Sequence, residues 1–479
     1  MQSQRNERVI VAIKRLVWLY FWLLIFEGAL RKWVVPQYSD PLLIVRDPVA
    51  IAIYALAIKG HVFPRNLWVY SLLIIGLLSA IVGALVLQPY LPIKPLLLVT
   101  VFGWRSDFLH LPLIWVIAKV FDGRDVKRMG WWILATLLPL AVLMAMQFNA
   151  SPDSFVNRVA GGSAEAQQIT AGGGKIRPPA TFSFISGVIF YAAVATSFLL
   201  YGALDRRTYR NWLLYAATFA LVVATAVSGS RSVLLSEFVV VASLGIIIFL
   251  RPSAINQFGR ILLLVIAVAL IVSRLPIFKE GVDILSERFT ASAEAAETTV
   301  TGGLIDRVTE GFTTPFKAIG HAPLFGYGLG IGTNAGAKFV TGRSTFLLSE
   351  SEWERIIFES GPILGVAFVL WRILLALRFG YLSVMQIKHG RILPIILYSS
   401  CFLSLLNGQF GQPTNLGFAV LVCGLCLASM EIEHYRGPIA SSEPEAAAPP
   451  PVKARVRRRS PYAERLHQTA DRTNGSADR

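Results

Sequence analysis

The sequence is poor in charged side chains. Only 15% of its 479 residues are Asp, Glu, Lys or Arg, whereas soluble domains carry about 25%. Hydrophobic residues make up 54% of the chain, and its mean hydropathy is +0.57. The net charge of +16 comes from basic residues that crowd short connections between apolar runs, which indicates membrane orientation rather than nucleic-acid binding. These properties exclude a soluble enzyme and predict an integral membrane protein.

Cysteine is scarce, and no cofactor motif is complete. The three cysteines, Cys401, Cys423 and Cys426, all lie inside apolar runs, so neither a disulfide framework nor a four-ligand zinc site is available and core packing is favoured. The glycine run GYGLGIG (326–332) lacks the Lys-Ser or Lys-Thr of a phosphate loop, and it predicts a tight turn instead. His321, just before it, has no metal-spaced partner and is interpreted as structural. We expect no metal and no cofactor.

Twelve apolar runs approach the length that a bilayer core requires. They lie near residues 9–29, 41–58, 67–88, 96–118, 129–147, 181–202, 212–228, 232–250, 261–275, 356–377, 392–406 and 416–430. Because lipid offers no partner for backbone N–H and C=O groups, each run is expected to be helical. The predicted fold is an all-α membrane protein with about twelve transmembrane helices, which together form a membrane domain over 1–430.

Lys and Arg are more frequent in every second connection, starting with the N-terminal one. This bias predicts that the N-terminus and the C-terminus are both cytoplasmic. The connection 148–180 and the large loop 276–355 then face the outer, periplasmic side. In the large loop, apolar residues recur every four positions over 304–312, as in a helix lying on the membrane surface. The basic tail 431–479 is predicted to be disordered and to lie near anionic lipid.

Several ionisable residues fall inside or at the rims of the predicted spans, where each one is energetically costly. In FEGALRKW, Glu27 and Arg31 are four residues apart on one helix face and are expected to form an ion pair. Opposite charges stand beside Pro in VRDP (46–47) and beside Gly and Trp in WRSD (105–107). These positions predict broken helix ends that face the bundle interior, either as structural pairs or as the lining of a cavity.

Arg231, in SGSRS, stands between two apolar runs and has no acidic residue within four positions. A guanidinium group matches phosphate oxygens through two parallel hydrogen bonds. This favours an anionic ligand at Arg231. The alternative is that the side chain reaches the lipid headgroups from a tight hairpin.

The segment SESEWERIIFESGP opens the tenth predicted span. Glu352, Arg355 and Glu359 are spaced so that they share one helix face. A carboxylate at the membrane rim, beside the bulky Trp353, is suited to act as a general base.

A purely structural interpretation of the same segment remains open. Ser349 with Glu352, or Ser351 with Glu354, fits the pattern of a helix-capping box. One cap does not require three glutamates, so the sequence leaves capping and chemistry as equal alternatives.

The order of these features resembles the O-antigen ligase and O-antigen polymerase family. The similarity covers about residues 130–430 and includes SGSRS, GHAPLFGYGLG and ESEWERIIFESGPILG. Members of that family have a GT-C-like helical bundle and transfer glycans from undecaprenyl pyrophosphate to an acceptor sugar, without a metal, at the outer face of the bacterial inner membrane. FEGALRKW and RPPATFSFISG resemble a subgroup associated with exopolysaccharide clusters.

The resemblance implies an inverting glycosyltransferase whose partners are the lipid-linked glycan, an acceptor glycan, membrane lipids and polysaccharide assembly proteins. The family's His-Asn pair is absent, and Glu350 and Ser351 stand in its place. The implied base is Glu352 or Glu350, and the implied diphosphate ligands are Arg231 and Arg177, with Arg288 and Arg307 from the large loop. The supporting residues are Trp353, Arg355, Glu359 and His321. The alternative function is a lipid-linked glycan transporter or an assembly component without chemistry.

Overall fold

The computed structural model describes residues 2–161, 168–172, 174–205, 207–250, 313, 315–342 and 346–430. The chain divides into two units, Met1–Gly437 and Pro438–Arg479, and every described residue lies in the first. The predicted span 261–275, the loop residues 276–312 and the tail 431–479 fall outside the described residues.

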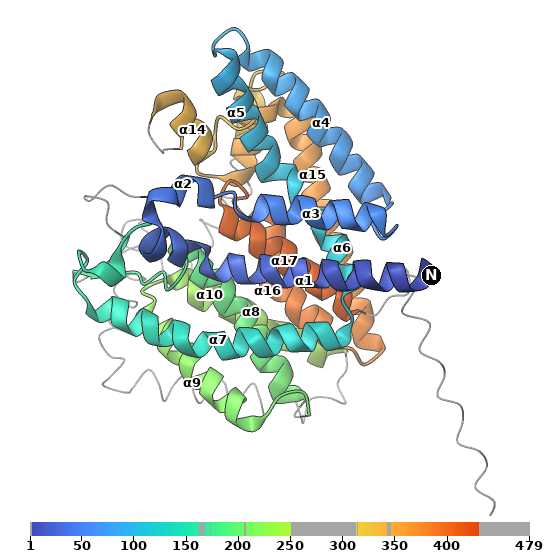
Figure 1. The fold of residues 1–479 in the computed structure, drawn as a ribbon, viewed down its shortest axis with the longest axis vertical. Coiled ribbons are helices and arrows are strands. Elements are labelled where there is room, and N and C mark those ends of the chain that lie inside the picture. The colour runs from blue at the N-terminus through green and yellow to red at the C-terminus, as the bar shows by residue number, and fades with distance from the viewer. Residues whose placement is uncertain are drawn as a thin grey trace, which may run out of the picture. The chain divides into compact units, whose positions relative to one another are not determined.

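The described part of the chain is almost entirely helical (Figure 1). Its longer helices are α1 (Gln2–Ala29), α3 (Arg46–Lys59), α4 (Leu67–Leu87), α5 (Ile93–Trp104), α7 (Gly123–Asn149), α8 (Ile185–Leu204), α9 (Asn211–Val227), α10 (Arg231–Leu250), α15 (Glu352–Lys388), α16 (Leu393–Asn407) and α17 (Pro413–Ser429). Its shorter helices are η1 (Leu30–Val34), η2 (Pro36–Tyr38), α2 (Ser39–Leu42), η3 (Arg105–Leu109), α6 (Leu113–Val120), η4 (Phe155–Asn157) and α14 (Asn334–Thr341).

The helices agree with the predicted membrane spans. Eight helical segments among the described residues are long and apolar enough to cross a bilayer, and α9, α16 and α17 are shorter apolar helices. Together they coincide with eleven of the predicted spans. The protein is therefore an all-α, multi-pass membrane protein. The surface-helix prediction for 304–312 lies outside the described residues.

Helix α17 lies at the centre of the bundle (Figure 1). Every residue from Asn415 to Ser429 is buried, and the helix packs against α6 and α16. All three cysteines are free and buried there or on α16, which confirms the core-packing interpretation. By contrast, α4 leaves large apolar side chains such as Leu77 and Leu85 exposed. Such a surface suits contact with lipid rather than water.

Two helices are interrupted by π-helical turns that hold charged residues. η1 follows α1 and buries Arg31 and Lys32, whereas η3 joins α5 to α6 and buries Arg105 and Asp107. A π turn frequently marks a functional or strained point in a helix. The prediction of a broken helix end facing the interior at 105–107 is confirmed.

The connection 148–180 contains a small hairpin in which β1 (Thr170–Gly172) pairs with β2 (Lys175–Ile176) in antiparallel fashion. Its first part is held by Asn157, whose amide donates to the backbone carbonyls of Gln147 and Ser151 at 3.1 and 2.8 Å. These bonds fix the connection against the end of α7.

Candidate functional site

The segment opening α15 forms a buried ion network with the π turn η3. Arg355 donates to Glu352 Oε2 at 3.0 Å, to Glu359 Oε2 at 2.8 Å and to Asp107 Oδ1 at 2.7 Å. The shared helix face predicted for Glu352, Arg355 and Glu359 is confirmed. With Arg372, these side chains form what we call the carboxylate cluster: Asp107, Glu352, Arg355, Glu359 and Arg372, all at most 4% exposed.

Arg372, which the sequence analysis passed over, ties the cluster to the loop between α16 and α17. It donates to Glu352 Oε1 at 2.9 Å and to the carbonyls of Leu405 and Gly408, both at 2.9 Å. Its guanidinium lies 3.8 Å from the ring centroid of Phe410. The signal that could have revealed it was an arginine inside a long apolar run, which is costly unless it is paired.

The glycine turn 326–332 brings the large loop onto the cluster. The backbone N–H of Gly332 donates to Glu359 Oε1 at 2.8 Å, and that of Gly328 donates to the Glu359 carbonyl at 3.1 Å. Gly326 has a φ of 72°, and a Cβ there would lie only 2.4 Å from the Glu359 carbonyl oxygen. Only glycine permits this conformation and this approach. The predicted tight turn is confirmed.

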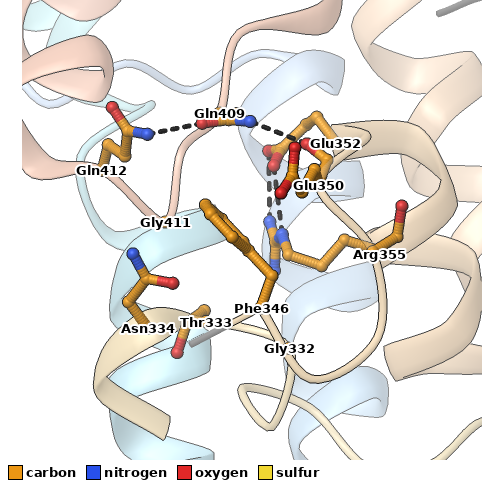
Figure 2. A pocket seen from close by; sticks show the side chains of 11 residues that line it. Gly332, Thr333, Asn334, Phe346, Glu350, Glu352, Arg355, Gln409, Gly411 and Gln412 are labelled. Carbon is orange, nitrogen blue, oxygen red and sulfur yellow. Dashed lines mark hydrogen bonds and ion pairs between the residues drawn. The ribbon is translucent and has the colours of Figure 1, made fainter. Parts of the chain in front are cut away.

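A pocket opens beside the cluster (Figure 2). Its cavity of about 20 Å³ is enough for one water. Figure 2 shows the Phe346 ring facing the pocket, with the Gln409 and Gln412 amides on one side and Asn334 on another. The lining residues come from the glycine turn, from the start of α15 and from the α16–α17 loop: Gly332, Thr333, Asn334, Phe346, Ser349, Glu350, Glu352, Arg355, Gln409, Gly411 and Gln412.

The two glutamates proposed as a base occupy different environments. Glu352 is 3% exposed, and its carboxylate accepts hydrogen bonds from Arg355, from Arg372 and from the Phe410 N–H at 3.0 Å. Glu350 also lines the pocket, but its side chain is exposed, and Gln409 donates to its backbone carbonyl at 2.7 Å. Glu350 therefore has the more accessible carboxylate, whereas Glu352 is already fully used as an acceptor.

The predicted capping box is wrong. Ser351 is the N-cap residue of α15, but its side chain makes no capping hydrogen bond. Instead, Ser349 Oγ donates to Glu354 Oε2 at 2.6 Å and accepts from the Ser351 N–H at 2.9 Å. Two arginines hold the Glu352 carboxylate in the cluster, away from Ser349, and Ser349 holds the Glu354 carboxylate, which a box with Ser351 would require.

A second buried network joins α1, η1, α3 and η3. Arg31 and Arg46 both donate to the Glu27 carboxylate, at 3.4 and 3.3 Å, which confirms the predicted Glu27–Arg31 pair. Asp47 accepts two hydrogen bonds from Arg105 and lies 3.0 Å from His110 Nε2. We call this network the basic cluster: Glu27, Arg31, Lys32, Arg46, Asp47 and Arg105, all at most 8% exposed.

Lys32 and Arg31 connect the two sequence segments that resemble the exopolysaccharide subgroup. Lys32 donates to the Phe182 carbonyl at 2.8 Å and to that of Ala180, while Arg31 donates to Ser183 Oγ at 2.9 Å. FEGALRKW and RPPATFSFISG, which are about 150 residues apart in the chain, are thus packed together.

Arg177 directly follows the β1–β2 hairpin of the connection 148–180, and Arg231 begins the helix α10. Arg231 is the first residue of α10 and follows Gly229, whose φ is 56°. A Cβ on Gly229 would lie 2.6 Å from the side chain of Ala171 and 3.8 Å from Cγ of Arg177. The SGSRS turn therefore packs on the β1–β2 hairpin. Both arginines are half-buried, and neither lines the pocket of Figure 2.

The remaining predicted residues have separate positions. Trp353 Nε1 donates to the Leu406 carbonyl at 2.7 Å, which supports the α16–α17 loop. His321 is exposed and does not line the pocket. Arg288 and Arg307 lie outside the described residues.

A comparison with protein-family models and with curated proteins found no match. In the described part of the chain, no three His, Cys, Asp or Glu side chains are arranged to hold a metal ion.

Proposed function

We propose that this protein is a glycosyltransferase of the O-antigen ligase and polymerase type. In this proposal it transfers a glycan from undecaprenyl pyrophosphate to an acceptor sugar at the periplasmic face of a bacterial inner membrane, with both termini in the cytoplasm. The observation that carries the proposal is the pocket, where an exposed carboxylate, Glu350, stands beside amides and an aromatic ring. Such a lining suits a sugar hydroxyl.

The proposed base is Glu350. It takes the proton of the acceptor hydroxyl while the acceptor oxygen bonds to the anomeric carbon and the bond from that carbon to the diphosphate oxygen breaks. Direct displacement inverts the anomeric centre. Because the cavity admits little more than one hydroxyl group, the rest of the acceptor sugar lies at its mouth, beside Phe346.

Glu352 has a positioning role in this proposal. Arg355, Arg372 and the Phe410 N–H hold its carboxylate. It thereby fixes the start of α15, which follows Glu350, against the loop that carries Gln409 and Gln412. Precise placement of the reacting groups supplies much of the rate when the donor is already activated.

The departing diphosphate needs positive charge. The turn before Arg231 packs on the hairpin that Arg177 follows, and guanidinium groups at a low-dielectric rim stabilise developing phosphate charge. The proposal assigns them to the donor side, separate from the acceptor pocket. Arg231→Ala is expected to abolish transfer without preventing membrane insertion.

The decisive experiment compares Glu350→Gln with Glu354→Gln in purified protein supplied with an undecaprenyl pyrophosphate-linked oligosaccharide and an acceptor. Loss of the base should lower the rate by about a hundredfold or more, with an unchanged melting temperature because Glu350 is exposed. Glu354 is the matched control, since it lies on the same segment but is engaged by Ser349. Equal rates in the two variants would contradict the proposal.

The same assay distinguishes a transporter. A transferase releases free undecaprenyl pyrophosphate as the glycan is moved, whereas a transporter translocates the intact lipid-linked glycan. Translocation in vesicles without release of the carrier would favour transport instead.

A further inference from the structure

The pocket is bordered by an excess of negative charge. Glu350 and Glu352 line it, and Glu352 is continuous with Glu359 and Asp107 through Arg355. These four carboxylates face only two guanidinium groups, those of Arg355 and Arg372, which leaves a formal charge of −2 among the described residues.

Neither guanidinium is available to a ligand's anion. The three guanidinium nitrogens of Arg355 donate to three carboxylates, those of Glu352, Glu359 and Asp107. Arg372 is fully buried and donates to Glu352 and to backbone carbonyls. An acidic ligand entering the pocket would therefore meet carboxylates without a free cation among the described lining residues, and like charges in a partly buried site repel strongly.

The other walls of the pocket are polar but uncharged. Gln409, Gln412 and Asn334 present amides, each of which combines donors with an acceptor. Asn334 Oδ1 is buried and has no hydrogen-bond partner among the described residues, so it can accept from a hydroxyl or amino group. The Phe346 ring offers an apolar face for the C–H side of a pyranose.

We propose that this pocket is an acceptor subsite that selects a neutral or amino sugar and rejects uronic acids and phosphorylated sugars. The inference rests on the proposed function, because it specifies the acceptor of that reaction. Its basis is the combination of the charge excess, the engaged arginines and the unpartnered Asn334 oxygen.

The direct test measures the binding of three probes to the full-length protein in nanodiscs by saturation-transfer NMR. The probes are methyl glucoside, methyl glucosaminide and methyl glucuronide. The neutral and amino glycosides are expected to bind at least tenfold more tightly than the glucuronide, and added salt should narrow the difference. Tighter or equal binding of the glucuronide, or no saturable binding by any probe, overturns the inference.

Two substitutions sharpen the test. Gln412→Arg places a cation at the pocket and should raise glucuronide affinity relative to glucoside about tenfold or more. Gln88→Arg, on an exposed residue at the end of α4, is the matched control for added charge and should leave the ratio unchanged. A shift of equal size in both variants would indicate a general surface effect and overturn the assignment to this pocket.

A third substitution tests the unpartnered oxygen. Asn334→Ala should weaken binding of the glucoside and the glucosaminide about tenfold while leaving the melting temperature unchanged, since Asn334 Oδ1 bonds no described residue. Unchanged binding of both probes would remove Asn334 from the subsite and contradict the inference.

Failure of the inference and failure of the proposed function give different results. If no acceptor supports transfer but the order of binding holds, the proposed reaction is wrong and the selectivity stands. If a uronic acid is the preferred acceptor in transfer, the reaction stands and the selectivity is overturned.

Discussion

The two buried clusters differ in the groups that their charged side chains bind. The carboxylate cluster has three acidic and two basic members, and its central guanidinium, Arg355, donates to three side-chain carboxylates. The basic cluster has four basic and two acidic members, so its two carboxylates cannot pair with every cation. Backbone carbonyls accept the remaining hydrogen bonds of its basic side chains. Lys32, for example, bonds only carbonyl oxygens in the described structure.

The two clusters also differ in position: the carboxylate cluster belongs to the candidate site, whereas the basic cluster is a scaffold that joins helices. The carboxylate cluster borders the pocket, so its excess charge acts on whatever enters there. None of the six members of the basic cluster lines that pocket. Their bonds reach Ser39, which is close in the chain, and Pro413 and the segment 180–183, which are distant. Buried clusters of charged side chains can therefore either shape a binding site or join helices.

The largest expected effect comes from removing the hub of the carboxylate cluster. Arg355→Met removes the guanidinium that Asp107 and Glu359 share, while Glu352 keeps Arg372, and breaking a buried pair in this way costs about 3 to 5 kcal/mol. The measurement is unfolding of the purified protein in detergent. Arg378→Met, at an exposed position on the same helix, should change stability little, and a similar loss in both variants would show that burial is not the cause.

Glu27→Gln should come next. It leaves Arg31 and Arg46 without their shared carboxylate, although the carbonyls of Ser39 and Pro413 still accept from them. We expect a loss of about 2 to 3 kcal/mol, with transfer per folded molecule unchanged. A large drop in the rate of glycan transfer per folded molecule would show that the basic cluster also serves the site.

Arg372→Lys keeps the charge but cannot reproduce the planar fork that reaches Glu352 and the carbonyls. Loss of two carbonyl bonds should cost about 1 to 2 kcal/mol. Because these bonds hold the loop with Gln409 and Gln412, the KM for the acceptor should rise more than kcat falls. An unchanged KM together with reduced stability would assign Arg372 to the scaffold.

The smallest effect is expected at Asp205, a partly exposed residue just after α8. A hydrogen bond from Thr208 Oγ1, at 2.7 Å, lowers the pKa of the Asp205 carboxyl, and Lys127 also favours its charged form. A lowered pKa in the folded state stabilises the protein above the unfolded pKa of about 3.9, and this stability is lost as the pH falls through the folded pKa.

Asp205→Asn should therefore be less stable than the natural chain at pH 7 by about 0.5 kcal/mol or less, because the site is partly exposed to solvent. The difference in stability should shrink as the pH falls through the folded pKa of the Asp205 carboxyl. A stability difference between the two proteins that grows on acidification would contradict the lowered pKa of Asp205.

Much of the fold was predictable because lipid imposes length and hydrophobicity on every span. The shared face of Glu352, Arg355 and Glu359 was also predictable, since helical spacing is local. The partners across the bundle were not. The Asp107–Arg355 bond joins residues 248 positions apart, and no local pattern encodes such a pairing.

The capping prediction failed for a related reason. Ser349, Ser351, Glu352 and Glu354 fit a local motif, but the long-range pull of Arg372 on Glu352 outweighed it. Gln409 and Gln412 were missed because polar residues between two spans are typical of ordinary loops. Their role depends on the pocket geometry, which only the folded chain shows.

The π turn at Arg105–Leu109 sets the angular phase between two helices. A π turn holds more residues than an α-helical turn, and residues 110–112 are not helical, so Leu113–Val120 does not continue the helical phase of Ile93–Trp104. All residues of Leu113–Val120 except Lys119 are buried, whereas Ile93–Trp104 buries one face. A single helical wheel drawn through 93–120 would consequently assign the buried residues of the two helices to the wrong faces.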